Sequence, residues 1–415
     1  MKLFAIKFTM ASAAAVAPLA SAAGAAYFLT NSDKANHIVA SVIGDDGKLS
    51  AGTATFAGGV GSGHTDAGFD ALFAQGPLLA KGSNVFAVNP GSNTIAMFTM
   101  DAADPTKLTM VGQPVSSQGE FPQSIAIHPT SGNICVLNGG KVNNVACFTP
   151  DPEQGLVAIA GTLREIGITQ STPPMGPPNT VTQVMFTLDG KRLVASVKGI
   201  PPAQPGFLAV WDVAADGSLS TGYSAITAPP GGALPFSLST LPHNPSVIVA
   251  TDPAIGFEVV DLNGSLRMAN NGTTAIPSAA VKHVMASGVS SSMAVPGQGA
   301  ICWSAFSPLT GNFYLIDPGT NTVTEVTVNS ATYKPTMIKQ YDSGANGNIL
   351  DAEVATVNGK DYLYIIAPNR TSIDVFSLRA YGLAQKIQSF DFTQSITGDA
   401  DLVPTRVVGM TAIWA

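Results

Sequence analysis

Lys198 is the one cation in a set of polar residues that each end a short apolar run. It occurs in the sequence ASVKG, directly before a proline-rich loop, IPPAQP. The equivalent positions hold Asn31, Asn89, Asn138, Asp252, Asp317 and Asn369. Asn and Asp favour strand ends and turns because their side chains hydrogen-bond to nearby backbone, which is the simpler explanation for these six. A lysine there could orient an anionic or carbonyl oxygen, so we predict a catalytic role for Lys198.

A second set of residues lies at the start of successive apolar runs. The set comprises Gln75, Gln123, Gln183, Phe236, Trp303, Asp351, Glu353 and Arg406. The glutamines supply neutral donors and acceptors, and the aromatic residues supply flat apolar walls unless they only pack in the core. We predict that Gln183 and Arg406 donate to a substrate oxygen, that Glu353 transfers protons, and that the others contact substrate. Alternatively, Asp351, Glu353 and Arg406 pair with one another.

His64 is the remaining catalytic candidate. It lies in a glycine-rich loop, GGVGSGHTDAGFD, two residues before Asp66. A His–carboxylate pair could act as a general base, whereas the alternative is a mobile surface loop. The sequence contains no HExxH, no paired CxxC, no GxSxG and no lysine after the glycine-rich stretch. We therefore expect no metal site, no cofactor and no α/β-hydrolase nucleophile.

The elements that would bring these residues together are short strands in a repeated order. Seven segments read as an amphipathic strand, a polar turn and a second strand, beginning near residues 37, 93, 144, 207, 256, 321 and 371. Six more read as apolar hairpins, at 69–89, 121–138, 181–198, 235–252, 301–317 and 349–369. The chain ends supply the missing inner pair, with 405–415 innermost and 25–32 beside it. We predict an all-β seven-bladed β-propeller closed by its terminal strands, in preference to a β-sandwich.

The composition fits one such domain, which we expect to span residues 23–415. Apolar residues make up 45% of the 415 residues and charged residues 11%, while 42 Gly and 29 Pro supply many turns. The net charge is −7 and no cluster of Lys and Arg occurs, which argues against nucleic acid as a partner. We expect a small-molecule substrate, bound where polar loop residues converge at the mouth of the channel.

Residues 1–22 are predicted to be a cleaved signal peptide. Lys2 and Lys7 precede an Ala-rich apolar run, and a small-x-small cleavage site follows it. The alternative, a short membrane anchor, would be too short and too Ala-rich to span a bilayer well. We therefore expect a protein of the secretory pathway or the extracellular space, with no membrane partner after cleavage.

Secretion would allow two modifications. Asn263, Asn271 and Asn369 each begin an Asn-x-Ser/Thr sequon in turn-like sequence, which marks glycosylation sites unless the matches arise by chance. Cys135 and Cys147 lie on two apolar runs separated by LNGGKVNN. If those runs pair antiparallel, the two sulfurs can form a disulfide across the hairpin.

Three stretches resemble a known family. FPQSIAIHPTSGNICVLNGG, STPPMGPPNTVTQVMFTLDGKRLVASVKG and PGFLAVWDVAADGSLS are similar to the fungal secreted branch of lactonase-type seven-bladed propellers. Members of that branch resemble carboxymuconate cyclases and phosphogluconolactonases. The resemblance covers most of the chain. It implies a fungal source and cofactor-free chemistry on a small organic ring system.

Three functions follow as hypotheses. The resemblance includes proteins similar to hetero-Diels–Alderases, which join a tropolone quinone methide to a sesquiterpene in meroterpenoid biosynthesis. A mouth rich in amides and aromatic rings, without metal or nucleophile, favours such a ring-forming step, which needs shape, stacking and a hydrogen bond to a developing oxyanion. The alternatives are an enzyme that forms or hydrolyses a lactone, using His64, Asp351 or Glu353, and a non-enzymatic secreted glycoprotein antigen.

Overall fold

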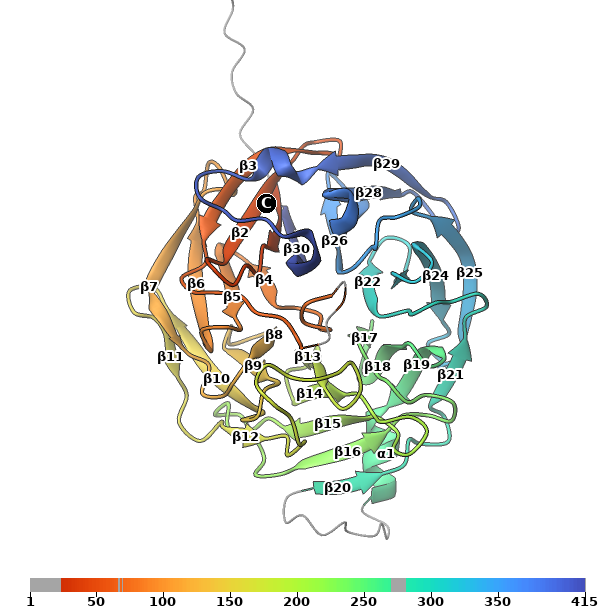
Figure 1. Ribbon diagram of the computed structural model, residues 1–415. Coiled ribbons are helices and arrows are strands. Elements are labelled where there is room, and N and C mark those ends of the chain that lie inside the picture. The colour runs from red at the N-terminus through yellow and green to blue at the C-terminus, as the bar shows by residue number, and fades with distance from the viewer. Residues whose placement is uncertain (1–23, 66–67, 69, 270–280, 415) are drawn as a thin grey trace, which may run out of the picture.

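Seven sheets of mainly antiparallel strands stand radially around a central axis (Figure 1). The computed structural model describes residues 24–65, 68, 70–269 and 281–414. Each sheet contributes one innermost strand, and every innermost strand contacts the next around the whole ring. The predicted all-β, seven-bladed propeller is confirmed.

The blades take up the chain in order, apart from the one that joins its two ends. From the innermost strand outward, the first blade consists of β30 (Val408–Trp414), β1 (Gly24–Leu29), β2 (His37–Ile43) and β3 (Leu49–Phe56). The second blade consists of β4 (Leu78–Lys81), β5 (Asn84–Asn89), β6 (Thr94–Met100) and β7 (Leu108–Ser116). The third blade consists of β8 (Pro122–Ile127), β9 (Ile134–Asn138), β10 (Asn144–Asp151) and β11 (Gly155–Ala158), with β12 (Arg164–Glu165) beside β10. The fourth blade consists of β13 (Val181–Phe186), β14 (Arg192–Val197), β15 (Phe207–Asp212) and β16 (Tyr223–Thr227), and the fifth of β17 (Leu238–Leu241), β18 (Asn244–Asp252), β19 (Gly256–Asp261) and β21 (Ser291–Ala294). The sixth blade consists of β22 (Trp303–Ser307), β23 (Asn312–Asp317), β24 (Thr322–Val328) and β25 (Pro335–Asp342). The seventh blade consists of β26 (Ala352–Val357), β27 (Lys360–Ala367), β28 (Ser372–Leu378) and β29 (Ala384–Asp391).

The ring closes where the two ends of the chain pair. β1 runs antiparallel to β30, with Gly24 opposite Trp414 and Leu29 opposite Val408. Gly24 permits the close approach, because a Cβ atom there would lie 2.5 Å from the carbonyl oxygen of Ile413. This pairing completes the four strands of the blade and joins the first and last strands of the ring.

The strands between the inner and outer edges are buried on both faces. Residues 361–367 of β27 and all of β28 are buried, because each blade packs against a neighbour on either side. The outermost strands, such as β7 and β25, are partly exposed. This explains why the sequence shows continuous apolar runs for the inner strands and amphipathic ones farther out.

One outer hairpin differs from the prediction. The segment after β19 was expected to turn and continue as a strand, but it forms helix α1 (Leu262–Ala269). Leu262 and Leu266 are one helical turn apart and pack against an apolar cluster that includes Ile248 and Val260. β21 takes the outer position in this blade instead, and β20 (Val281–Val284) joins the preceding blade parallel to β16.

A second difference concerns the first expected inner hairpin, 69–89. Only β4 and β5 form it, and residues 70–76 do not extend β4. Phe73 and Gly76 have positive φ angles, of 46° and 79°, and Pro77 has no amide hydrogen to donate. These features take residues 70–76 away from the blade, and Figure 1 shows the orange chain between β3 and β4 at the centre of the ring.

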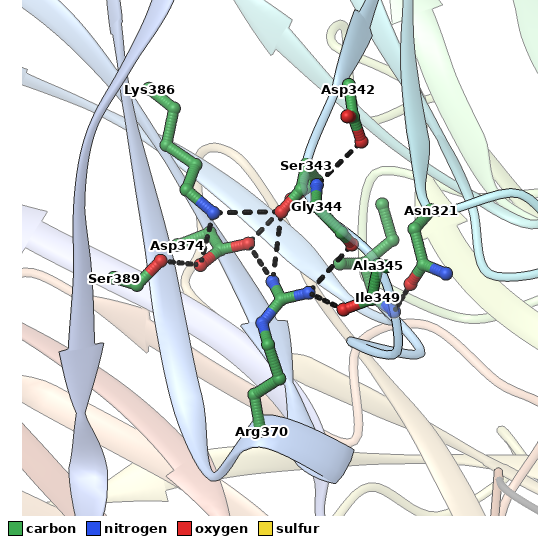
Figure 2. Close-up of polar contacts among 10 residues, drawn as sticks. All are labelled: Asn321, Asp342, Ser343, Gly344, Ala345, Ile349, Arg370, Asp374, Lys386 and Ser389. Carbon is green, nitrogen blue, oxygen red and sulfur yellow. Dashed lines mark hydrogen bonds and ion pairs between the residues drawn. The ribbon is translucent and has the colours of Figure 1, made fainter.

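Figure 2 shows a buried ion-pair cluster between the sixth and seventh blades. Asp374, on β28, is fully buried and accepts hydrogen bonds from Ser343 and Ser389, each at 2.6 Å. Arg370 donates to the same carboxylate, and the Lys386 ammonium lies 3.3 Å from it. Lys386 also donates to the Ser343 carbonyl, which follows β25, so the cluster joins the two blades.

The structure describes the two predicted disulfide cysteines and two of the three predicted glycosylation sites. Cys135 and Cys147 face each other on β9 and β10 and are joined by a disulfide. Asn369 is exposed, Asn263 is half-buried on α1 rather than in a turn, and Asn271 lies outside the described residues. The predicted signal peptide, residues 1–22, also lies outside them. None of the described helices is long and apolar enough to cross a bilayer.

Candidate active site in the central channel

A segment of the chain crosses the channel at the level where the innermost strands β8 and β22 begin. We call residues Asp70–Gly76 the plug segment. The main-chain carbonyls of residues 72–74 accept hydrogen bonds from side chains of three blades: Gln123 on β8 at 3.3 Å, Lys198 after β14 at 3.4 Å and Trp303 on β22 at 3.0 Å. One predicted catalytic residue, Lys198, and two residues predicted to contact substrate, Gln123 and Trp303, therefore hold the plug segment.

Gln75 connects the plug segment to both sides of the channel. Its side-chain amide donates to the carbonyl of Ser304, on β22, at 2.9 Å and accepts from the amide of the same residue at 3.3 Å. Its main chain donates to Thr182, on β13, and accepts from the Ser124 hydroxyl, on β8. Both polar ends of the Gln75 side chain are thus occupied.

Lys198 is buried without a counter-ion. Its side chain is 3% exposed, and its ammonium group lies 5.2 Å from the ring centre of Phe73 and 4.9 Å from that of Phe236. It forms no ion pair with any carboxylate of the described residues. Burial lowers the pKa of Lys198 to about 8, although the nearby Asp70 carboxyl opposes this. Burial also raises the pKa of Asp70 to about 6.

His64 is buried beside the plug segment rather than exposed in a surface loop. Its ring packs edge-on against Phe73 and Phe121, with ring centres 5.2 and 5.3 Å apart. Burial, followed by the charge of Lys198, lowers its pKa to about 3, so the imidazole is neutral at physiological pH. Asp66, its predicted partner, lies outside the described residues.

Below the plug segment the channel contains a cavity of about 200 Å³. It extends from Gln75 and Gly76 to Ile127 and Phe186, the last residues of β8 and β13. It therefore runs toward the face that carries the inner hairpin turns, opposite to the predicted mouth. The rest of its lining is Leu79, Ile125, Ala126, Gln183, Val184, Met185, Glu353 and Met410.

Glu353 is the only ionisable residue among those that line the cavity. One carboxyl oxygen accepts a hydrogen bond from the Val354 amide at 3.0 Å, and no other described donor is bound to this group. Burial raises the pKa of Glu353 to about 7. A carboxyl group with this pKa can both take up and release a proton near neutral pH. Burial also holds the pKa of Asp351 well above its usual range, and Asp351 does not line the cavity.

Gln183 provides a hydrogen-bond donor to the same cavity. Its side-chain oxygen accepts from the Leu238 amide, on the neighbouring innermost strand, at 2.5 Å. This bond fixes the orientation of the side-chain amide. Among the described residues, nothing accepts a hydrogen bond from its NH₂ group. The cavity therefore combines one proton-transfer group with one oriented, unpaired donor.

The other predicted residues lie elsewhere. Arg406, in the short helix η3 (Pro404–Arg406), pairs with Asp33 at 2.9 Å and not with Asp351 or Glu353. Phe236 and Trp303 pack edge-on against each other, with ring centres 5.0 Å apart. The structure therefore brings Glu353, Gln183 and Gln75 together in the cavity, and Lys198, Gln123, Phe236 and Trp303 together around the plug segment.

Five of the other six strand-end polar residues bind loop backbone through their side chains, as turn chemistry predicts. Asn31 pairs with both main-chain groups of Ser62, and Asp252 accepts from the amides of Ala233 and Leu234. Asp317 accepts from two loop amides in the same way. Lys198 differs from these residues, as its positive charge indicates. The group that it binds is a main-chain carbonyl of the plug segment. Among the described residues, no three His, Cys, Asp or Glu side chains are grouped to hold a metal ion.

The comparisons with known proteins identify the fold. No family model matches the sequence, and no curated protein matches it. The structure resembles that of a candidate 6-phosphogluconolactonase from Bacteroides fragilis, with a TM-score of 0.59, 16% identity, and 96% of this chain and 100% of that chain covered. It also resembles a periplasmic gluconolactonase from Pseudomonas aeruginosa, with a TM-score of 0.59, 16% identity, and 88% and 96% covered. The chain thus shares its fold with lactonase-type seven-bladed propellers.

Sequence reasoning missed the plug segment and the cavity beneath it. Phe73, which contacts Lys198 and His64, stands in the sequence as one more apolar residue of an expected strand. Gly76 and Pro77 were the only local signals that the strand begins later. Main-chain carbonyls carry no residue-specific signal, so their role as partners of Lys198, Gln123 and Trp303 could not be predicted.

Proposed function

We propose that this protein hydrolyses or forms a lactone in the channel cavity, with Glu353 as the general base and acid. The observation that carries the proposal is the Glu353 carboxyl group, with a pKa raised to about 7 in a cavity that also holds the unpaired NH₂ group of Gln183. The likeness in fold to propellers described as lactonases supports the same chemistry at a coarse level.

The residues suggest a sequence of proton transfers for hydrolysis. The Glu353 carboxylate takes a proton from water as the water oxygen bonds to the lactone carbonyl carbon. The Gln183 NH₂ group donates to the oxyanion that develops on the carbonyl oxygen. When the ring C–O bond breaks, the protonated Glu353 returns its proton to the alkoxide that leaves. The reverse sequence closes a hydroxy acid into a lactone and releases water.

The test is hydrolysis of uncharged lactones by the purified protein, followed by chromatography of the acid product. Glu353→Gln keeps the shape of the side chain but cannot accept the proton, and we expect it to lower kcat/KM by about 10²–10⁴-fold. The matched control is Glu153→Gln, which removes an exposed carboxylate on a turn after β10. Equal activity of Glu353→Gln and the unaltered protein would contradict the assignment.

A hetero-Diels–Alderase is the second candidate, supported by the group around Lys198. An ammonium donor between two aromatic rings suits a cycloaddition in which negative charge develops on a carbonyl oxygen. In the structure, however, the plug segment already contacts Lys198. The volume of the cavity, about 200 Å³, also lies below the range of about 300–1,000 Å³ that holds drug-sized ligands. This function therefore requires displacement of residues 70–76. Incubation with a quinone-methide precursor and humulene tests it, and product ratios equal to those of the uncatalysed reaction would exclude it.

We also propose that the protein enters the secretory pathway. The Cys135–Cys147 disulfide and the exposed sequon at Asn369 support this, since both suit an oxidising compartment with glycosylation. A non-enzymatic glycoprotein would have the same features but no turnover of lactones or of the cycloaddition substrates. Mass spectrometry of the secreted protein, with and without a glycosidase, tests cleavage after residue 22 and occupancy of Asn369.

A further inference from the structure

We infer that the substrate is an uncharged, largely apolar lactone of one or two rings, and not a sugar lactone or a phosphorylated one. This inference rests on the proposed function and specifies the substrate class of the same cavity. It separates this chain from the activities after which its structural neighbours are named.

The charge of the cavity argues against an anionic substrate. Of the residues that line it, none is Lys, Arg or His, and Glu353 is the sole ionisable group. Lys198 cannot supply the missing cation, because its ammonium group binds the Phe73 carbonyl in the plug segment and is not part of the lining. The base is active as a carboxylate, so a phosphorylated lactone would bring a second anion into a partly buried space without a counter-ion.

The shortage of hydrogen-bonding groups argues against a sugar lactone. The polar side chains of the lining are Gln75, Gln183 and Glu353, and both ends of Gln75 are bonded to Ser304. The Gln183 donor and the Glu353 carboxyl group serve the reacting ester. Ring hydroxyls would therefore leave water without free side-chain partners in the cavity, which opposes binding of each such group.

The walls favour hydrocarbon instead. Eight of the twelve lining residues have apolar side chains, among them Leu79, Ile125, Met185, Phe186 and Met410. Contact with these side chains removes apolar surface of both ligand and protein from water, which stabilises an aliphatic or aromatic lactone in the cavity. The volume of about 200 Å³ limits such a ligand to a small ring system.

The inference is tested with four lactones at pH 7.5: dihydrocoumarin, γ-nonalactone, glucono-δ-lactone and 6-phosphoglucono-δ-lactone. We expect kcat/KM for the two apolar lactones to exceed that for glucono-δ-lactone by at least about 100-fold, since several hydroxyls would each cost about tenfold. The phosphorylated lactone should show no enzymatic turnover. Glu353→Gln, run beside Glu153→Gln, establishes that the measured turnover occurs in the cavity.

The possible results separate the two proposals. Glu353-dependent turnover of the sugar or phosphorylated lactone at a rate equal to the apolar ones would overturn the substrate class and leave the proposed function intact. Absence of turnover for all four would refute both. A second variant, Met185→Lys, places a cation in the half-buried lining and is expected to raise the ratio of phosphorylated to apolar turnover at least tenfold. An unchanged ratio, in a variant whose circular dichroism matches that of the unaltered protein, would contradict the charge argument.

Discussion

Replacement of Lys198 by Met should make the protein more stable at neutral pH. The lysine is 3% exposed, and burial lowers its pKa from 10.5 to about 8. At about 1.4 kcal/mol for each pKa unit, the folded state holds the charged form at a cost of about 3 kcal/mol. Met has a similar length, no charge, and suits the space between the rings of Phe73 and Phe236.

The cost depends on pH in a defined direction. Below pH 8 Lys198 is protonated in both the folded and the unfolded chain, so folding bears the whole cost. Between pH 8 and 10.5 the unfolded chain holds the proton that the folded chain has released, and stability therefore rises with pH by about 3 kcal/mol. The Met variant lacks this rise. Its advantage should be about 3 kcal/mol at pH 7 and close to zero near pH 10.5.

The measurement is urea unfolding at pH 7 and pH 10, and the background matters. Asp70 opposes the lowering of the Lys198 pKa, so the comparison is made between Asp70→Asn and Asp70→Asn/Lys198→Met, where the advantage of Met at pH 7 should be at least about 3 kcal/mol. His64, with a pKa of about 3, and the Cys302 thiol, whose pKa burial raises, do not titrate in this window. A Met variant that is less stable at pH 7, with the same pH dependence as its background, would show that Lys198 has a stabilising partner and would refute the reasoning.

Three further perturbations test the packing of the blades. Glu258 is fully buried, and its pKa is raised well above 4.5, mainly by burial and secondly by Asp252. The stability of the folded protein should therefore fall as pH rises above about 4.5. Glu258→Gln should flatten this fall in thermal melts between pH 5 and 8, and a pH profile identical to that of the unaltered protein would contradict the prediction. Asp374→Asn leaves two partly exposed cations without a counter-ion and should cost about 3 kcal/mol in urea unfolding; a change below about 1 kcal/mol would show that the cluster in Figure 2 is not stabilising. Replacing both Cys135 and Cys147 with Ala opens a short loop and should lower stability by about 3 kcal/mol, with no loss expected if the bond does not form in solution.

The fold could be predicted because its signals are repeated and local. Each blade has its own alternation of apolar runs and turns, and the chain ends, 25–32 and 405–415, complete the count without any other partner. The outer strand after β19 could not be found in this way. Leu262 and Leu266 suit either a strand or a helix, and the choice is made by the packing of α1 against Ile248 and Val260.

The candidate site could be predicted only in part. The repeat register places Gln183 and Glu353 on innermost strands, which is enough to put both in the channel. It cannot show that residues 70–76 leave their blade and divide the channel, because this depends on contacts between main-chain carbonyls and distant side chains. For the same reason the register could not show that Arg406 pairs with Asp33, outside the cavity.

The pH dependence of lactone hydrolysis tests the central claim, that Glu353 is the proton-transfer group of the channel cavity. The ordinary pKa of a glutamate is 4.5, and burial raises that of Glu353 to about 7. A general base is active when deprotonated, so kcat/KM for dihydrocoumarin should rise with pH and level off above an inflection near 7. This inflection should be absent from the residual activity of Glu353→Gln and unchanged in Glu153→Gln. An inflection near 4.5, or one near 7 that persists in Glu353→Gln, would contradict the account.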